Sequence, residues 1–224
     1  MASDLTGLFV AGTDTGVGKT RIAAACIAHI AAQGRTVVGM KPVASGCPAS
    51  GTALCDDVRQ LAAAANVGAP QEWINPYRFV PPVAPHLAAA MAGQTISLKH
   101  IRDCYGQLQK LADTVVVEGV GGLLVPLNDR EDTADLALQL KLPVLLVVGL
   151  RLGCINHALL TVAALQQRGL RLYGWVANAL EPAMPLQDDV VAALRQRIAA
   201  PLLAVLPYAP QASATELAER IRLA

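Results

Sequence analysis

The sequence feature that most constrains this chain is the run Gly-Thr-Asp-Thr-Gly-Val-Gly-Lys-Thr at residues 12–20. An apolar stretch (residues 8–11) precedes the run and a helix-like stretch (residues 21–32) follows it, so the order is strand, glycine-rich loop, helix. Glycines allow successive backbone N–H groups to converge on an anion, and the helix N-terminus adds roughly half a positive charge. The run therefore predicts a phosphate-binding loop after a buried strand.

This loop departs by one place from the usual pattern of Gly, four residues and Gly-Lys-Ser/Thr. Thr13 occupies the position of the first glycine, and Gly12 lies one residue earlier. We interpret the run as a variant P-loop in which Lys19 reaches the outer phosphates and the Thr20 hydroxyl binds Mg²⁺. An ordinary glycine-containing turn is the alternative interpretation. The residues of the loop are Gly12, Thr13, Asp14, Thr15, Gly16, Val17, Gly18, Lys19 and Thr20.

The composition is that of a folded domain with an aliphatic core. Hydrophobic residues make up 54% of the 224 residues and charged residues 16%, which argues against disorder. The formal net charge of +1, with no run of Lys or Arg, gives no sign of a nucleic-acid-binding surface. Because no signal-peptide pattern or membrane-spanning run is seen, we expect a soluble, cytoplasmic protein with residues 1–224 in one domain.

The cysteines and histidines show no pattern typical of disulfides or metal sites. Five cysteines are an odd number, and no two of them form a Cys-x-x-Cys pair. We therefore expect reduced thiols at Cys26, Cys47, Cys55, Cys104 and Cys154. The four histidines lack metal-ligand spacing, so a zinc site is not expected.

Apolar strands alternate with helices along the chain. Strands are predicted at residues 8–11, 36–40, 114–117, 143–149, 170–177 and 202–206. Helices are predicted at residues 21–32, from 56 onward, and at 86–91, 98–112, 133–140, 156–168, 187–198 and 214–221, with a proline-rich irregular excursion at 73–85. This pattern indicates an α/β fold of the P-loop NTPase type: a single domain with a mostly parallel sheet and helices on both faces. Ligands of such sheets bind beyond the C-terminal ends of the strands.

Two carboxylates are candidate magnesium ligands. Glu118 directly follows four apolar strand residues and is followed by Gly119, Gly121 and Gly122, which would let a ligand approach the backbone. A strand-end carboxylate that faces solvent is the alternative. Asp57 could join Thr20 and Glu118 as an oxygen ligand. It could equally be an ordinary first-turn helix charge, and Asp56 competes for the same role.

Three further sites could carry chemistry. Lys41 follows a strand and could neutralise charge on a phosphoryl group, although most such lysines lie on the surface. The run Gly-Cys-Ile-Asn-His at residues 153–157 opens a helix and could present N–H groups to an anion, or it could be a plain helix start. Asn178 follows a strand and carries an amide that could contact an adenine edge, or it could serve a local turn.

Taken together, these motifs resemble the dethiobiotin synthetase family. The loop at residues 12–20 is similar to that family's own variant P-loop. The motifs Lys-Pro-Val-Ala-Ser-Gly (41–46), Asn-Pro-Tyr (75–77), Pro-His (85–86), Val-Glu-Gly (117–119) with Gly-Gly (121–122), Gly-Cys-Ile-Asn-His (153–157) and Gly-Trp-Val-Ala-Asn (174–178) follow in the family's order. The resemblance covers nearly the whole chain, apart from residues 47–54 and 179–185.

The resemblance implies that 7,8-diaminononanoate, carbon dioxide and MgATP are converted into dethiobiotin, ADP and phosphate. It implies that Thr15, Lys19, Lys41 and Ser45 surround a substrate carbamate and the γ-phosphate. Thr20, Asp57 and Glu118 would hold Mg²⁺, and Asn178 and Glu118 would join the P-loop in binding ATP. It further implies a homodimer in which the helix start at Gly153, Cys154, Ile155 and Asn156 meets the substrate carboxylate across the interface.

Other classes of P-loop protein fit the sequence less well. Switch ATPases of the partitioning and metal-insertion kind are the main alternative, but they carry a lysine early in the loop, where this chain has Asp14. The synthetase half of a cobalamin-pathway amidotransferase would need an additional glutaminase domain. An inactive homologue would not be expected to keep Lys19, Thr20, Lys41 and Glu118.

Overall fold

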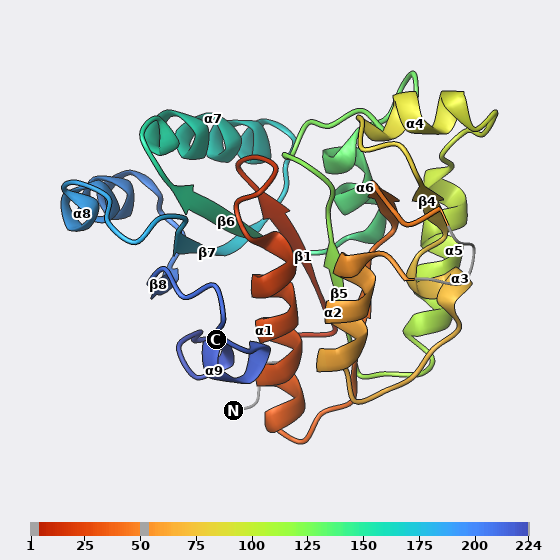
Figure 1. Ribbon diagram of the computed structural model, residues 1–224, viewed down its shortest axis with the longest axis horizontal. Helices are drawn as coiled ribbons and strands as arrows, with labels where there is room; N and C mark the ends of the chain where they lie inside the picture. Colours follow the sequence, from red (N-terminus) through yellow and green to blue (C-terminus); the bar gives the residue numbers. More distant parts are fainter. Residues whose placement is uncertain (1–4, 50–53, 224) are drawn as a thin grey trace.

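The computed structural model describes residues 5–49 and 54–223 (Figure 1). The strands are β1 (Gly7–Gly12), β2 (Val37–Met40), β3 (Val43–Ser45), β4 (Tyr77–Phe79), β5 (Thr114–Glu118), β6 (Val144–Leu150), β7 (Leu172–Ala179) and β8 (Leu202–Leu206). The helices are α1 (Lys19–Ala32), α2 (Asp56–Ala64), α3 (Gln71–Ile74), α4 (Pro85–Met91), α5 (Leu98–Leu108), α6 (Thr133–Leu140), α7 (Cys154–Gln167), α8 (Gln187–Arg197) and α9 (Ala214–Ala218).

Six strands form one parallel sheet in the order β2-β5-β1-β6-β7-β8. This confirms the predicted α/β fold with a parallel sheet. Parallel strands point the same way, so the segments that follow β1, β2 and β5 all leave the sheet at one edge. The order β2-β5-β1 therefore brings the P-loop, Lys41 and Glu118 to neighbouring positions, although they lie far apart in the sequence.

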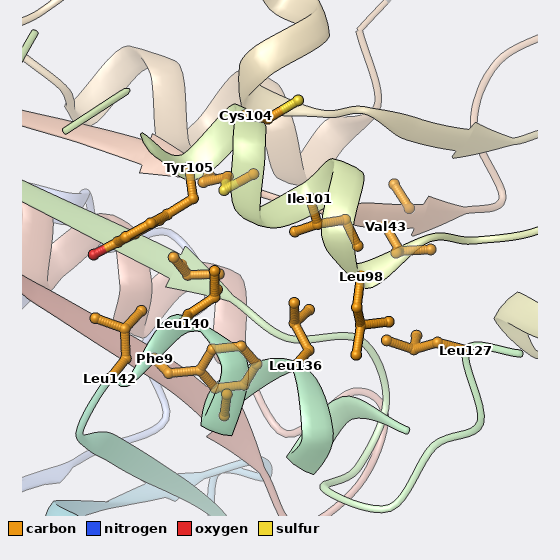
Figure 2. Packing of buried hydrophobic residues seen from close by; sticks show 14 of the residues in the cluster. Phe9, Val43, Leu98, Ile101, Cys104, Tyr105, Leu127, Leu136, Leu140 and Leu142 are labelled. Carbon is orange, nitrogen blue, oxygen red and sulfur yellow. The ribbon is translucent and has the colours of Figure 1, made fainter. Parts of the chain in front are cut away.

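Side chains of β1 alternate between two apolar layers. Leu8 and Val10 lie in a cluster with residues of α1 and α9, whereas Phe9 and Ala11 lie in a cluster with residues of α5 and α6. Figure 2 shows Phe9 beside Leu136 and Leu140 of α6 in the second layer. Because every residue of β1 is buried, the strand is apolar throughout and has no polar face.

Several predicted boundaries were wrong at the helix C-termini. The helix predicted to reach residue 112 ends at Leu108, and the one predicted to reach 221 ends at Ala218. In both places the next turn is closed by hydrogen bonds between residues three apart, such as Leu111 N–H to Leu108 O at 3.0 Å. Strand β7 continues to Ala179, beyond the predicted end at 177, because it pairs with β6 as far as Leu150.

The proline-rich excursion contains a strand that the sequence analysis missed. β4 pairs in parallel with β3, which follows Lys41, and the two form a separate two-stranded sheet. The prolines beside β4 (Pro76 before it, Pro81 and Pro82 after it) argued against a strand here, because proline cannot donate a backbone hydrogen bond to a sheet. Three residues form a strand here because a partner from a distant part of the chain lies beside them, which no local pattern reveals.

The expectation of reduced thiols was wrong for two cysteines. Cys47 and Cys55 form a disulfide with a Cα–Cα distance of 4.8 Å, whereas Cys26, Cys104 and Cys154 are free and buried. A disulfide requires its Cα atoms to lie about 4.4–6.8 Å apart. That proximity arises because the chain after β3 lies against the start of α2. Residues 50–53, like residues 1–4 and 224 of the predicted single domain, lie outside the described residues.

Candidate active site

The P-loop lies at the rim of a cleft of about 660 Å³ at the C-terminal edge of the sheet. The cleft is lined by Thr15, Gly16, Gly18, Lys19, Thr20 and Arg21, by Lys41 and Ser45, by Asp57 and Gln60 of α2, by Pro82, Val83, Ala84 and Pro85, and by Glu118, Val120, Gly121 and Val125. Nine of the 18 predicted site residues therefore line one cleft. Part of the predicted excursion, residues 82–85, forms one wall.

Two glycines of the loop are required by the space around them. A Cβ atom at Gly12 would lie 2.7 Å from Cγ2 of Val17 and 3.0 Å from the side chain of Lys19. Gly18 has a φ of 93° at the N-cap of α1, and a Cβ atom there would lie 2.4 Å from Nδ2 of Asn178. The early position of Gly12 thus has a physical reason, because a side chain there would clash with Val17 and crowd Lys19.

Lys19 folds back over the loop. Its Nζ donates a hydrogen bond of 2.8 Å to the carbonyl oxygen of Asp14, and its side chain is buried. Burial, together with the nearby charge of Lys41, lowers the pKa of Lys19 to about 8. A phosphate group beside Lys19 would stabilise the charged form, so the loop favours an anionic ligand.

A compact polar cluster joins α1, α2, β2 and β5. The Thr20 hydroxyl lies 2.8 Å from Oε1 of Glu118 and 3.1 Å from Oδ1 of Asp57. Nζ of Lys41 lies 2.6 Å from the same oxygen of Glu118 and 2.8 Å from Oδ2 of Asp57, and it also donates to the Gly119 carbonyl. The three predicted magnesium ligands and the predicted catalytic lysine are therefore in direct contact.

Burial excludes two alternative interpretations, a solvent-facing carboxylate at Glu118 and a surface lysine at Lys41. Glu118 is 1% exposed and Lys41 is 3% exposed, so neither is a surface charge. Asp57 points into the cleft, whereas Asp56 is exposed and pairs with Arg59 on the same helix. Of the two competing carboxylates, Asp57 is the one placed beside Thr20 and Glu118.

The charges in the cluster shift one another's pKa values. Burial raises the pKa of Glu118, and the positive charge of Lys41 only partly opposes this. Burial acts to lower the pKa of Lys41, but the carboxylates of Glu118 and Asp57 outweigh it, so the pKa of Lys41 is raised. For Asp57 burial raises the pKa, yet Lys41 dominates and the net direction is downward. Lys41 is thus held in its charged form.

The residues present fit a magnesium ion. Oε2 of Glu118 is buried and has no hydrogen-bond partner among the described residues, which is costly for a carboxylate oxygen unless a cation meets it. Magnesium takes oxygen ligands and is commonly held by one or two carboxylates together with waters and phosphates. In the described part of the chain no three His, Cys, Asp or Glu side chains converge; the candidate donors are the carboxylates of Asp57 and Glu118 and the hydroxyl of Thr20.

Thr15 and Ser45 both line the cleft, as predicted for substrate or phosphate contacts. The backbone N–H of Thr15 donates to Oδ1 of Asp14 at 2.7 Å. Oγ of Ser45 is buried and has no hydrogen-bond partner within the described ranges. A buried hydroxyl without a partner is available to a bound ligand.

Asn178 lies behind the loop rather than in the cleft. Its Nδ2 donates to the carbonyl oxygen of Val17 at 2.9 Å, and its side chain is 5% exposed. Asn178 therefore supports the P-loop backbone, a role that the sequence analysis did not consider. Contact with adenine stays a prediction, and it would involve Oδ1 or the second hydrogen of Nδ2.

The predicted anion site at residues 153–156 also lies outside the cleft of its own chain. Gly153 is the N-cap of α7 with a φ of 90°, the first turn contains no acidic residue, and no side chain caps it. The N–H of Cys154 donates to the Arg151 carbonyl oxygen, which leaves the N–H groups of Ile155 and Asn156 to face an anion. None of these four residues is among those that line the cleft.

Arg151, which was not predicted as a site residue, forms an ion pair with Asp14 of the P-loop. Arg151 lies just before the motif at residues 153–157, and its charge was the available signal. Gln60 and Val125, which line the cleft, were also missed. Neither carries a pattern that distinguishes it from other residues of its segment.

Structural comparison shows the fold alone. A chain of the MinC:MinD cell division protein complex of Aquifex aeolicus matches with a TM-score of 0.55, 14% identity and coverage of 95% of this chain and 85% of that chain. Cobyrinic acid a,c-diamide synthase of Mycobacterium smegmatis, solved with ADP and magnesium, matches with a TM-score of 0.55, 17% identity and coverage of 96% and 93%. Both matches support the P-loop fold class.

Within residues 5–49 and 54–223, no helix combines the length and apolarity needed to cross a membrane.

Sequence comparison is more specific. A family model described as an AAA domain matches residues 6–216. The ATP-dependent dethiobiotin synthetase of Nitrosospira multiformis is 53% identical over 218 residues, which cover 97% of this chain and 95% of that protein. The synthetase of Aromatoleum aromaticum is 51% identical over 216 residues, which cover 96% of each. Together with the P-loop and the buried cluster of Lys41 and Glu118, these similarities show that the chain belongs to the ATP-dependent dethiobiotin synthetase family.

Proposed function

We propose that this protein converts 7,8-diaminononanoate, carbon dioxide and ATP into dethiobiotin, ADP and phosphate. One substrate amine adds to carbon dioxide and loses a proton to give a carbamate. A carbamate oxygen then attacks the γ-phosphorus of ATP, and ADP leaves. The second amine attacks the carbonyl carbon of the resulting carbamic-phosphoric anhydride and loses a proton, and phosphate leaves as the ureido ring closes.

The observation that carries this proposal is the contact between Lys41, Glu118 and Asp57 beside the P-loop. Phosphoryl transfer between bound substrates requires little covalent chemistry from the protein, so catalysis comes from positioning and charge stabilisation. Lys19 and Lys41 supply two positive charges to the cleft that Thr15 and Ser45 also line. We propose that these four residues surround the carbamate and the transferred phosphoryl group.

We propose that Thr20, Asp57 and Glu118 hold Mg²⁺. When bound, this ion neutralises charge on the phosphate oxygens and fixes their position. The buried unpaired oxygen of Glu118 and the hydroxyl of Thr20 support this assignment. Lys41 contacts the carboxylates of both Asp57 and Glu118, so it would lie close to a phosphate group bound to the Mg²⁺ ion.

We also propose that the active unit is a homodimer. In the first turn of α7 the N–H groups of Ile155 and Asn156 have no partner within the described residues, yet this turn does not line the cleft of its own chain. The adjacent Leu152 is 98% exposed and Leu160 of α7 is 62% exposed, which leaves apolar surface beside this helix start. A second subunit would cover this surface and receive the helix start at its own cleft, where it would bind the substrate carboxylate.

Two further assignments concern the nucleotide base and the location of the protein. We propose that Asn178 contacts adenine, because it lies immediately behind the loop that holds the phosphates. We propose a cytoplasmic location, because the substrate ATP is made and used there. The Cys47–Cys55 disulfide is the feature least typical of that compartment.

The function is tested by measuring ADP release by the purified protein with MgATP and bicarbonate, with and without 7,8-diaminononanoate, together with mass detection of the product. Release that depends on the diamine and yields dethiobiotin supports the proposal. The Lys19→Ala variant is the negative control for the site. ATP hydrolysis that is indifferent to the diamine would contradict the proposal and favour a nucleotide-controlled switch.

The dimer is tested by light scattering of the same preparation. A homodimer has twice the chain mass of 23.3 kDa. Leu152→Asp should shift the protein toward monomer and raise the KM for the diamine more than that for ATP. A monomeric wild-type protein with full activity would refute the shared site.

A further inference from the structure

An ion pair joins the P-loop to the junction between β6 and α7. The carboxylate of Asp14 pairs with the guanidinium of Arg151, which is the first residue after β6. The carbonyl oxygen of Arg151 accepts a hydrogen bond of 3.0 Å from the N–H of Cys154, the first residue of α7. The position of Arg151 is therefore fixed by the sheet and by the helix start, while its side chain reaches the loop.

Asp14 shapes the loop backbone around it. Its Oδ1 accepts the N–H of Thr15 at 2.7 Å, and its carbonyl oxygen accepts Nζ of Lys19 at 2.8 Å. The Thr15 N–H and, to a smaller degree, the charge of Arg151 lower the pKa of Asp14. Asp14 therefore carries a full negative charge in a loop whose proposed ligand is a polyphosphate.

A negative charge in this position opposes phosphate binding unless a cation offsets it. Lys19 offsets it only in part, because its Nζ is bound to the main-chain oxygen of Asp14 and its charge also interacts with Glu118 and Asp57. We propose that Arg151 is a positioning residue of the P-loop: it neutralises the Asp14 carboxylate and holds it on the Thr15 N–H, so that the loop accepts the phosphates of ATP. This inference rests on the proposed function only in taking a nucleotide as the ligand of the loop.

The ion pair contributes little to folding. Both side chains are partly exposed, at 40% and 44%, and pairs of this kind have small effects on stability. The expected effect is on nucleotide affinity, because an unpaired Asp14 carboxylate would repel the phosphates of the nucleotide. From Coulomb interactions at such a site we expect about a five- to tenfold loss of nucleotide affinity, reduced by salt.

The test is calorimetric titration of MgADP into five forms of the protein: wild type, Arg151→Gln, Arg151→Lys, Asp14→Asn and the double variant Arg151→Gln with Asp14→Asn. Arg151→Gln should bind about five- to tenfold more weakly at low salt, and about twofold more weakly at roughly 0.5 M salt. Arg151→Lys should stay within about twofold of wild type. The double variant should recover most of the affinity, because the amide oxygen introduced by Asp14→Asn still accepts the Thr15 N–H but carries no charge.

Lys99→Gln is the matched control. It removes the same charge from an exposed ion pair with Asp103 on α5, outside the residues that line the cleft, and it should bind MgADP as wild type does. The unfolding midpoint should be almost unchanged in Arg151→Gln. In steady-state assays Arg151→Gln should raise the KM for ATP and leave kcat almost unchanged.

The proposal is overturned if Arg151→Gln binds MgADP like wild type. It is also overturned if the double variant binds MgADP as weakly as Arg151→Gln does, because removing the charge of Asp14 would not restore affinity if Arg151 served only to support the loop structure. It is also overturned if wild-type protein does not bind MgADP. Dethiobiotin formation is measured in parallel. Absence of that product with intact MgADP binding would refute the proposed function while the comparison of variants still decides the role of Arg151.

Discussion

Lys41 and Glu118 show how one residue's role depends on its immediate partners. Lys41 is buried only because two carboxylates meet its charge, and Glu118 is buried only because Lys41 and Thr20 meet one of its oxygens. Removing one partner of such a buried group leaves an uncompensated charge, which typically costs about 3–5 kcal/mol in free energy of unfolding. The cluster is therefore important for stability as well as for the proposed chemistry.

Replacing Lys41 tests its catalytic role. Lys41→Met should lower kcat at least about a hundredfold, because only Lys19 of the two lysines would then offer positive charge to the transferred phosphoryl group. The measurement is steady-state dethiobiotin formation, accompanied by urea unfolding to verify that the variant is folded under assay conditions. An unchanged kcat in folded protein would refute this role.

Replacing Glu118 tests the magnesium site. Glu118→Gln keeps the shape of the side chain but removes its charge, so the Mg²⁺ concentration for half-maximal activity should rise at least about tenfold. Glu219→Gln, which changes an exposed carboxylate of the C-terminal region, is the matched control and should leave the Mg²⁺ dependence unchanged. Equal Mg²⁺ dependence in the two variants would remove Glu118 from the metal site.

At the scale of residues, the sequence analysis identified the members of the cluster but not their contacts. Glycine and lysine spacing was enough to find the P-loop, because its chemistry is local. The choice of Asp57 over Asp56 and the position of Asn178 behind Val17 depended on the direction of side chains in space. The pair of Asp14 and Arg151 joins residues 137 positions apart, which no local pattern contains.

At the scale of elements, the start of α2 is held to the chain after β3. The disulfide links Cys47 to Cys55, the N-cap of α2, and Asp57 is the second residue of that helix. Asn75 strengthens the same region, because its Nδ2 donates to the carbonyl oxygen of Lys41 at 2.6 Å. These links place the carboxylate of α2 beside the residues that follow β2.

The disulfide can be tested by counting thiols and by stability. Unfolded protein treated with iodoacetamide should take up three alkyl groups without prior reduction and five after reduction. The double variant Cys47→Ala with Cys55→Ala should lose about 2.5 kcal/mol of unfolding free energy in urea titrations. Without the bond between residues eight positions apart, the unfolded chain gains conformational entropy. Five alkyl groups without reduction would show that the bond is absent.

At the scale of the whole molecule, stability depends on two apolar layers that also bury titratable groups. Cys26 of α1 lies fully buried in the layer beneath α1, and Tyr105 of α5 lies in the opposite layer (Figure 2). Burial raises the pKa of Cys26 from 9.0 to about 12 and that of Tyr105 from 10.0 to about 12. Both groups must therefore stay protonated in the folded protein.

These shifts predict alkaline destabilisation. A folded-state pKa above the unfolded value gives stability that is complete below about pH 9 and is lost as the pH rises from 9.0 toward about 12. Cys26 alone should cost about 2 kcal/mol of unfolding free energy by about pH 10.5, relative to neutral pH. Urea titrations at several pH values should show this slope, and it should flatten in Cys26→Ala with Tyr105→Phe. An equal slope in wild type and variant would contradict this origin.

The sequence by itself determined the parallel sheet, the P-loop and the set of charged residues at the strand ends, because hydrophobic periodicity and glycine spacing act over a few residues. Tertiary structure alone decided the pairing of β3 with β4, the Cys47–Cys55 disulfide and the Asp14–Arg151 ion pair. Each of these joins segments that come together only when the whole chain has folded. Contacts of that kind depend on where whole elements pack, and local residue patterns do not encode them.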